Sequence, residues 1–147
     1  MAVTVPQLMT MSQTDLDALF KASPAGPIPN GEAEGTAIIA PGTKLEGFAA
    51  RFIHFFAWQG KVFDAQKGEL RNKILPIGLK AIVAKVYKGA SWFDNKECIV
   101  LDYSQTSFVA GDIRDEIRLV GDGVYLGLVY MGKKKLIDFA LQFPKQT

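Results

Sequence analysis

Short runs in which apolar and polar residues alternate, or in which apolar residues predominate, make up most of the chain and predict β-strands. Turn-forming residues such as Gly121-Asp122-Gly123 separate most of these runs, and the last three are joined by links of only a few residues. About eight short antiparallel strands favour closure into a barrel, because closure removes exposed sheet edges. The expected strands are Glu32–Ala40, Lys61–Phe63, Glu69–Ile74, Ala81–Tyr87, Glu97–Ser104, Ile113–Val120, Val124–Met131 and Lys135–Phe143.

One segment between the first two expected strands has a helical period instead. Thr43 and Glu46 form a capping box, and Gly60 is placed to end a helix over Lys44–Trp58. A helix of about fifteen residues is too short to span a bilayer, but it can cover a barrel or lie on a membrane surface. Its apolar arc contains Leu45, Phe48, Ala49, Phe52, Phe55 and Phe56.

The first thirty residues predict a peripheral arm. Thr14 is a suitable N-cap for a short helix that carries Leu16 and Phe20. The proline- and glycine-rich segment Ser23–Gly31 then predicts an extended connector. Residues 31–147 are expected to form a single barrel domain, since 147 residues fit one domain.

Composition mainly excludes classes of partner. The net charge is only +2 and the basic residues are scattered, so we expect no nucleic-acid partner. With one His, one Cys and no metal-ligand motif, the sequence predicts no metal site. It also contains no phosphate-binding loop, so we expect no cofactor. Cys98 lies in an apolar run and is interpreted as a plain buried thiol. The first residues do not resemble a secretory signal, so a cytoplasmic protein is the expectation, with the oligomeric state left open.

The strand around Asp115 contains the most informative polar pattern. Alternation places Asp115 on one face with Ile113, Ile117 and Leu119. In the simplest account this face points inward, and an ionised carboxylate there needs a donor, a raised pKa or a wet cavity. The other face, which would then lie in solvent as a charged ladder, carries Arg114, Glu116 and Arg118.

Asp102 and His54 are the other candidates for acid/base chemistry. Asp102 shares a strand face with Cys98 and Val100, and if it also points inward it would pair with Asp115. The alternative is that each carboxylate anchors a loop. His54 lies off the Phe arc of the expected helix, where it either faces a pocket and carries a proton or is simply exposed. The candidate catalytic residues are therefore Asp115, Asp102 and His54.

A one-residue change of register would exchange this set for another. Tyr103 would then lie inside the barrel together with Arg114, Glu116 and Arg118. An interior Arg–Tyr pair suits a ligand with a carboxylate, because guanidinium binds carboxylate through two parallel hydrogen bonds. The candidate ligand-binding residues are Tyr103, Arg114, Tyr87, Phe52 and Trp58.

Three further features stand together in the sequence: Gly31-x-x-x-Gly35 in an early strand, a helix before the second strand, and final strands ending in Tyr125-Leu126-Gly127 and Phe139–Phe143. In these features the chain resembles the calycin superfamily, which includes lipocalins and fatty-acid-binding proteins. The helix after the first strand is more like the fatty-acid-binding branch. The stretch from Trp58 to Gly127 is also similar to uncharacterised bacterial proteins of the Gly-x-Trp-x-Gly type. The calycin resemblance implies a barrel that holds a small apolar ligand.

The sequence therefore predicts a protein that binds a small hydrophobic or amphipathic molecule inside a β-barrel. The alternative is a cofactor-independent isomerase, cyclase or hydratase that uses acid/base catalysis in the same cavity. A third hypothesis is a peripheral membrane role through the helix expected at residues 44–58.

Overall fold

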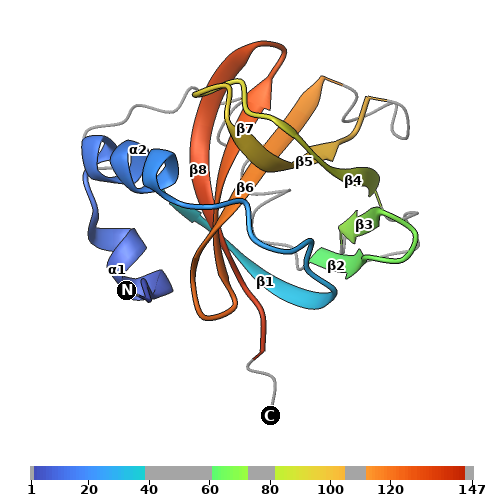
Figure 1. The fold of residues 1–147 in the computed structure, drawn as a ribbon, viewed down its shortest axis with the longest axis horizontal. Helices are drawn as coiled ribbons and strands as arrows, with labels where there is room; N and C mark the ends of the chain where they lie inside the picture. Colours follow the sequence, from blue (N-terminus) through green and yellow to red (C-terminus); the bar gives the residue numbers. More distant parts are fainter. Residues whose placement is uncertain (1, 39–60, 73–81, 105–111, 145–147) are drawn as a thin grey trace.

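Eight strands form one closed antiparallel barrel in the computed structural model, which describes residues 2–38, 61–72, 82–104 and 112–144 (Figure 1). Each strand pairs with the next one along the chain, and β8 closes the barrel by pairing with β1. The expected mainly β, eight-stranded barrel is thus confirmed. The strands are β1 Gly31–Ile38, β2 Lys61–Asp64, β3 Glu69–Asn72, β4 Ile82–Ala90, β5 Glu97–Asp102, β6 Ile113–Gly121, β7 Val124–Met131 and β8 Lys134–Gln142.

The last three strands form the meander that their short links predict. Gly123 lies in the β6–β7 turn with φ 65° and Gly132 in the β7–β8 turn with φ 61°. Glycine adopts this left-handed conformation without the steric cost that a Cβ would impose, so both hairpins can turn tightly. The resulting pairs β6–β7 and β7–β8 each extend over nearly the whole length of their strands.

The barrel interior is filled largely by apolar side chains from all eight strands. Phe139 of β8 lies opposite Gly127 of β7, and a Cβ at position 127 would overlap the Phe139 ring. The glycine therefore makes room for an aromatic ring inside the barrel. The buried interior members on the strands are Ala33, Ala37, Phe63, Leu70, Ala84, Val86, Ile99, Leu101, Ile113, Ile117, Tyr125, Val129, Ile137, Phe139 and Leu141.

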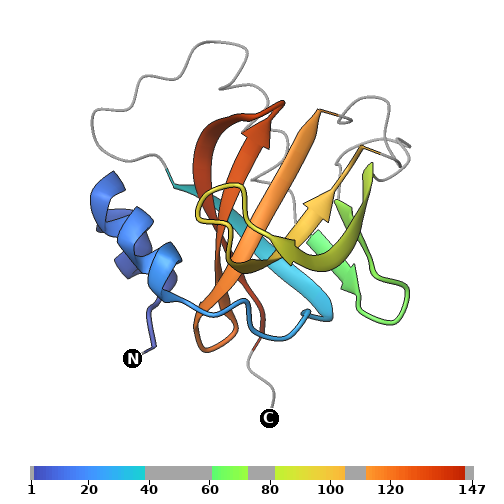
Figure 2. The ribbon, with the colours of Figure 1, turned by 45° about the horizontal axis from the view of Figure 1, so that its top comes forward.

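The connector between the helices and β1 closes one end of the barrel. The Leu119 amide donates a hydrogen bond to the Pro24 carbonyl (3.0 Å), and the Tyr125 hydroxyl donates to the Pro27 carbonyl (2.7 Å). The Tyr125 ring also packs against Phe143, which in turn packs against Phe63. Figure 2 shows this segment crossing the β6–β7 turn on its way to the start of β1. The predicted extended connector is thus an integral part of the barrel.

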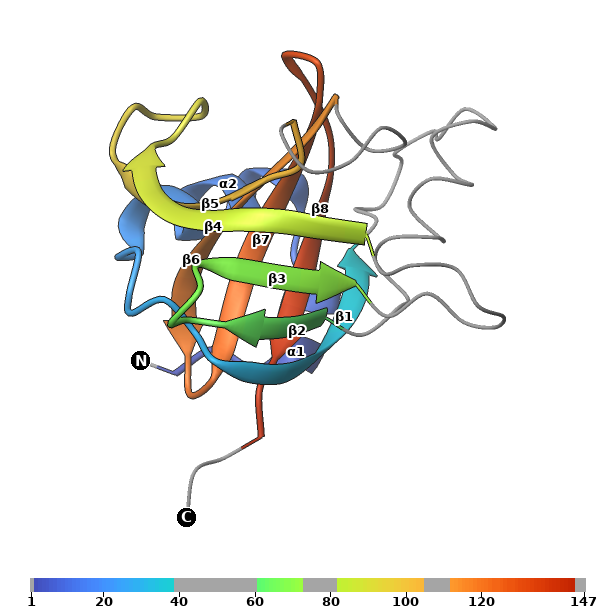
Figure 3. The ribbon, with the colours of Figure 1, turned by 90° about the vertical axis from the view of Figure 1, so that its right-hand side faces the viewer.

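Two short helices, α1 (Val5–Thr10) and α2 (Gln13–Ala22), cover the outer face of β6, β7 and β8 (Figures 1 and 3). Only one N-terminal helix was expected, with Thr14 as its N-cap. Ser12 is the N-cap instead, because its side chain accepts a hydrogen bond from the Asp15 amide (3.1 Å), and Thr14 lies inside α2. The helices bury Leu8, Leu16 and Phe20 against Val120, Leu126, Leu128 and Ala140.

The expected helix over Lys44–Trp58 lies outside the described residues, and so do its candidate site residues Phe52, His54 and Trp58. Their predicted roles stay predictions. In the part of the chain that the structure describes, neither helix is long and apolar enough to cross a membrane.

Candidate functional site

Three polar side chains lie in the apolar interior of the barrel. Lys61 is the first residue of β2, Tyr103 directly follows β5, and Asp115 is the third residue of β6. Their residues are 2%, 0% and 4% exposed, respectively. The period of two explains their direction, because each shares a strand face with interior apolar residues: Phe63 for Lys61, Leu101 for Tyr103, and Ile113 and Ile117 for Asp115.

The same three residues lie toward one end of the barrel. Neighbouring strands run antiparallel, so the beginnings of β2 and β6 are at the same end as the termination of β5. The connector and the Tyr125–Phe143–Phe63 cluster close the opposite end. The interior is therefore divided into an aromatic end and a polar end.

Lys61 and Tyr103 are in direct contact. The Lys61 Nζ donates a hydrogen bond to the Tyr103 hydroxyl at 3.4 Å and lies 5.9 Å from the centre of the Phe139 ring. Gly127 of β7 leaves the space that the Phe139 ring occupies. Phenolic oxygen and an aromatic face are both groups that accommodate an amine in an apolar interior.

Burial dominates the electrostatics of Asp115 and Lys61. Loss of hydration raises the pKa of Asp115 from 3.8 to about 6, although the Lys61 charge opposes this shift. Burial likewise lowers the pKa of Lys61, and the Asp115 charge opposes it. No group among the described residues hydrogen-bonds to Asp115 Oδ1, which is buried. Both side chains thus have ionisation equilibria displaced toward neutral pH, as groups that transfer protons require.

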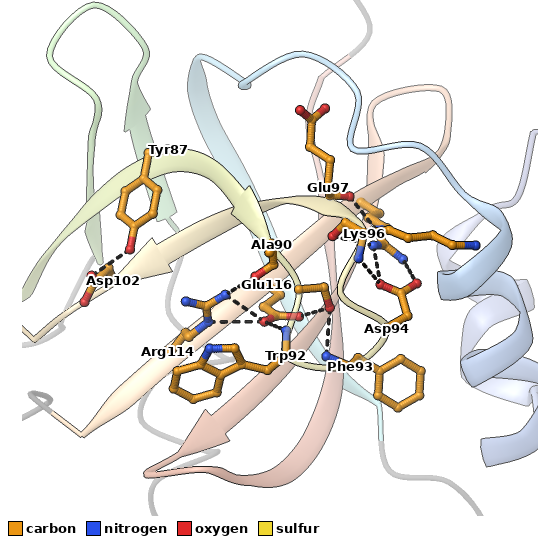
Figure 4. A network of polar contacts seen from close by, with 12 residues as sticks. Tyr87, Ala90, Trp92, Phe93, Asp94, Lys96, Glu97, Asp102, Arg114 and Glu116 are labelled. Carbon is orange, nitrogen blue, oxygen red and sulfur yellow. Dashed lines mark hydrogen bonds and ion pairs between the residues drawn. The ribbon is translucent and has the colours of Figure 1, made fainter.

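The opposite face of β6 carries a second set of buried charges, outside the barrel. Figure 4 shows Glu116 beneath the β4–β5 hairpin, where its carboxylate accepts hydrogen bonds from Ser91 Oγ (2.5 Å) and the Trp92 amide (2.7 Å). Arg114 Nη2 makes a third contact with Glu116 at 3.0 Å. The Arg114 guanidinium also stacks over the Trp92 ring. The expected solvent-exposed ladder is therefore wrong for Glu116, because the hairpin folds over it.

Arg118 joins the same hairpin to α2. Its guanidinium makes a two-pronged ion pair with Asp94 (2.6 and 2.7 Å) and donates to the Phe20 carbonyl of α2 (2.9 Å). The Arg118 contact holds the pKa of Asp94 at about 2, well below its ordinary value. Arg118 is 1% exposed, so its predicted place in solvent is also wrong. We refer to Arg114, Glu116, Arg118 and Asp94 as the outer network.

Asp102 and Tyr87 belong to this outer face. The Tyr87 hydroxyl donates to Asp102 at 2.9 Å, and Asp102 lies opposite Arg114 in the β5–β6 register. Asp102 also accepts hydrogen bonds from the Ser104 amide and hydroxyl, the loop-anchoring role considered as its alternative. An interior pair of Asp102 and Asp115 is consequently not formed. Because Tyr103 and Asp115 share the interior, an interior Tyr103–Arg114 set is not formed either.

Lys61 is the interior residue that sequence reasoning missed. Its alternation with Phe63 was a weak signal, since a strand of four residues has only two positions on each face. Cys98, in contrast, is buried outside the barrel, and burial raises the pKa of its thiol to about 12, as expected for a plain buried cysteine.

Comparison with known proteins supports the architecture. No protein-family model matches the sequence, and no curated protein is significantly similar to it. A crystal structure of a protein from Thermomonospora curvata is similar to the chain, with a TM-score of 0.60 and 15% sequence identity. The match covers 92% of this chain and 90% of that one. At this identity the likeness shows a shared fold and nothing about activity.

Proposed function

We propose that the barrel binds a small amphipathic molecule in its interior. The polar group of the ligand would meet Lys61, Tyr103 and Asp115, and its apolar part would contact the aromatic end. The observation that carries this proposal is the placement of an amine, a phenol and a carboxyl group together in an otherwise apolar barrel interior. Apolar sites with a few convergent polar groups are typical of small-molecule binding.

A purely structural role explains Asp115 poorly. Burial of an ionisable group costs several kcal/mol unless hydrogen bonds and an opposite charge offset it. Within the described ranges Asp115 Oδ1 has no such hydrogen bond, whereas Glu116, the next residue on the strand, has several. A ligand group that donates to Asp115 would supply the missing contact.

The resemblance to calycins supports the same proposal. Members of that superfamily hold small apolar ligands in barrels, and we propose that this chain does so too. The interior polar groups favour an amphipathic ligand over a plain hydrocarbon, because a hydrocarbon would leave them without new contacts.

Binding of dansylundecanoic acid, a fluorescent fatty acid, tests the proposal. We expect saturable fluorescence enhancement with the native protein and at least about tenfold weaker binding with Lys61→Met, the effect of losing one buried hydrogen-bond donor. Lys88→Met is the matched control, because it removes the same amino group from an exposed position. Circular dichroism verifies that both variants fold. Equal binding by the native protein and both variants, or no binding at all, would contradict an interior site of this kind.

Acid/base catalysis is a second candidate, favoured by the pKa of Asp115 at about 6. A carboxyl group with this pKa exchanges protons readily near neutral pH, as an isomerase requires. Conversion of an apolar β,γ-unsaturated ketone into its conjugated isomer, followed by ultraviolet absorbance, provides a direct assay. Asp115→Asn should abolish such turnover and Asp102→Asn should leave it intact. Equal rates in these two variants would exclude Asp115 as the base.

A further inference from the structure

We propose that Lys61 binds its ligand covalently, as an imine between Nζ and the carbonyl carbon of an apolar aldehyde or ketone. This inference rests on the proposed interior site and names the class of molecule that would occupy it. Two observations carry it: the amine is enclosed in the barrel, and a buried carboxyl group with an unused hydrogen-bonding position lies in the same interior. The part of the chain that the structure describes provides that position with no donor.

The surroundings of Lys61 favour a nucleophilic amine. Only a neutral amine attacks a carbonyl carbon, and an apolar enclosure disfavours the charged form of lysine. The pKa of Lys61 is lowered by burial, in agreement with this geometry. Tyr103 acts as a positioning residue, because its hydroxyl oxygen holds Nζ on the interior side of β2. Phe139 supplies an apolar surface beside the amine.

The reaction balances with the groups present. The Nζ lone pair attacks the carbonyl carbon, the C=O π electrons move to oxygen, and a proton passes from nitrogen to oxygen to give a carbinolamine. The C–OH bond then breaks as Asp115 donates its proton to the departing hydroxyl, which leaves as water. The products are a protonated imine on Lys61 and the Asp115 carboxylate. No oxidant or reductant is consumed.

This outcome explains why Asp115 remains without a donor to Oδ1 in the described residues. The protonated imine carries an N–H⁺ group in the interior, and the Asp115 carboxylate is its counter-ion. The charge coupling between Lys61 and Asp115 is already present without a ligand, because each shifts the pKa of the other. The ionisable groups that face Lys61 from the described strands are Tyr103 and Asp115.

Reductive trapping tests the inference. The full-length protein is incubated at neutral pH with a naphthaldehyde and cyanoborohydride, which reduces imines to stable secondary amines, and peptides are analysed by mass spectrometry. We expect modification of Lys61 at least about tenfold faster than modification of exposed Lys88, because the apolar enclosure favours the neutral, nucleophilic amine. Lys61→Arg should abolish the labelling at residue 61, because a guanidinium group stays protonated and does not attack the aldehyde.

The Asp115→Asn variant tests whether Asp115 donates the proton in imine formation or has only a structural role. We expect at least about a hundredfold slower labelling of Lys61, the usual contribution of a positioned acid, with unchanged labelling of Lys88. Asp102→Asn is the control carboxylate on the outer face and should change neither rate. Labelling that follows solvent exposure, with Lys88 modified before Lys61, would overturn the imine.

The two proposals fail in different ways. If dansylundecanoic acid binds the interior but Lys61 is not labelled, the imine is wrong and the ligand site stands. If neither probe reaches the interior, both proposals are wrong. Labelling of Lys61 that naphthalene without an aldehyde group does not block would contradict a shared interior site. Labelling that excess dansylundecanoic acid suppresses would support both.

Discussion

Asp115 and Glu116 are neighbours on β6, yet they are buried in opposite ways. Each is almost completely removed from solvent, Asp115 inside the barrel and Glu116 outside it. Glu116 accepts hydrogen bonds from Ser91, Trp92 and Arg114, whereas Oδ1 of Asp115 receives none from the residues that the structure describes. Glu116 therefore has the hydrogen bonds of a structural carboxylate, whereas Asp115 has an oxygen that could still accept a hydrogen bond.

The comparison has an energetic side. Buried charges stabilise a protein only when paired and hydrogen-bonded, as those of the outer network are. For Asp115 and Lys61, the loss of hydration shifts both pKa values more than their mutual attraction does, so we expect this interior pair to lower stability. Such a cost is characteristic of functional sites. Substitutions in the two regions should therefore act with opposite sign.

The largest loss is expected for Arg118→Met. It leaves Asp94 without its two-pronged partner and removes the link from the hairpin to α2, so the free energy of unfolding should fall by ~3–5 kcal/mol in urea titrations. The Asp94 part of this stability is present above the ordinary carboxyl pKa of 3.8 and is lost as the pH falls toward about 2. A loss below about 1 kcal/mol would show that the outer network is not a stabilising unit.

Asp115→Asn should act in the opposite direction. The folded-state pKa of about 6 lies above the ordinary 3.8, so the native protein should lose stability as the pH rises through this interval. The variant should not show this loss, and at neutral pH it should gain about 1–2 kcal/mol, less than the full shift because Lys61 loses its counter-charge. Glu116→Gln is the matched substitution and should lose about 2 kcal/mol. Equal signs for the two variants in parallel urea titrations would refute the distinction.

Tyr87→Phe should have the smallest effect. The substitution removes one hydrogen bond to Asp102 on a half-exposed surface, so the loss of unfolding free energy should stay below about 1 kcal/mol. Binding of dansylundecanoic acid should be unchanged, because Tyr87 lies outside the barrel. A clear drop in probe affinity in a fluorescence titration would place the ligand on the outer face instead of in the interior.

The barrel could be predicted because the residues that determine each hairpin lie close together in the sequence. Alternation and turn residues define each hairpin within a few positions, and they also suggested the inward direction of Asp115. The burial of Glu116 and Arg118 could not be predicted, since it depends on residues 91–96 and α2, which are distant along the chain. Lys61 escaped notice because β2 is too short to show a period. The expected helix with His54 remains a prediction.

The connector that crosses the aromatic end would restrict where a ligand can enter and leave the barrel. Because the Pro24 and Pro27 carbonyls accept hydrogen bonds from the β6–β7 hairpin, the connector blocks this end of the barrel. A ligand bound in the interior, as proposed above, would not leave through this end.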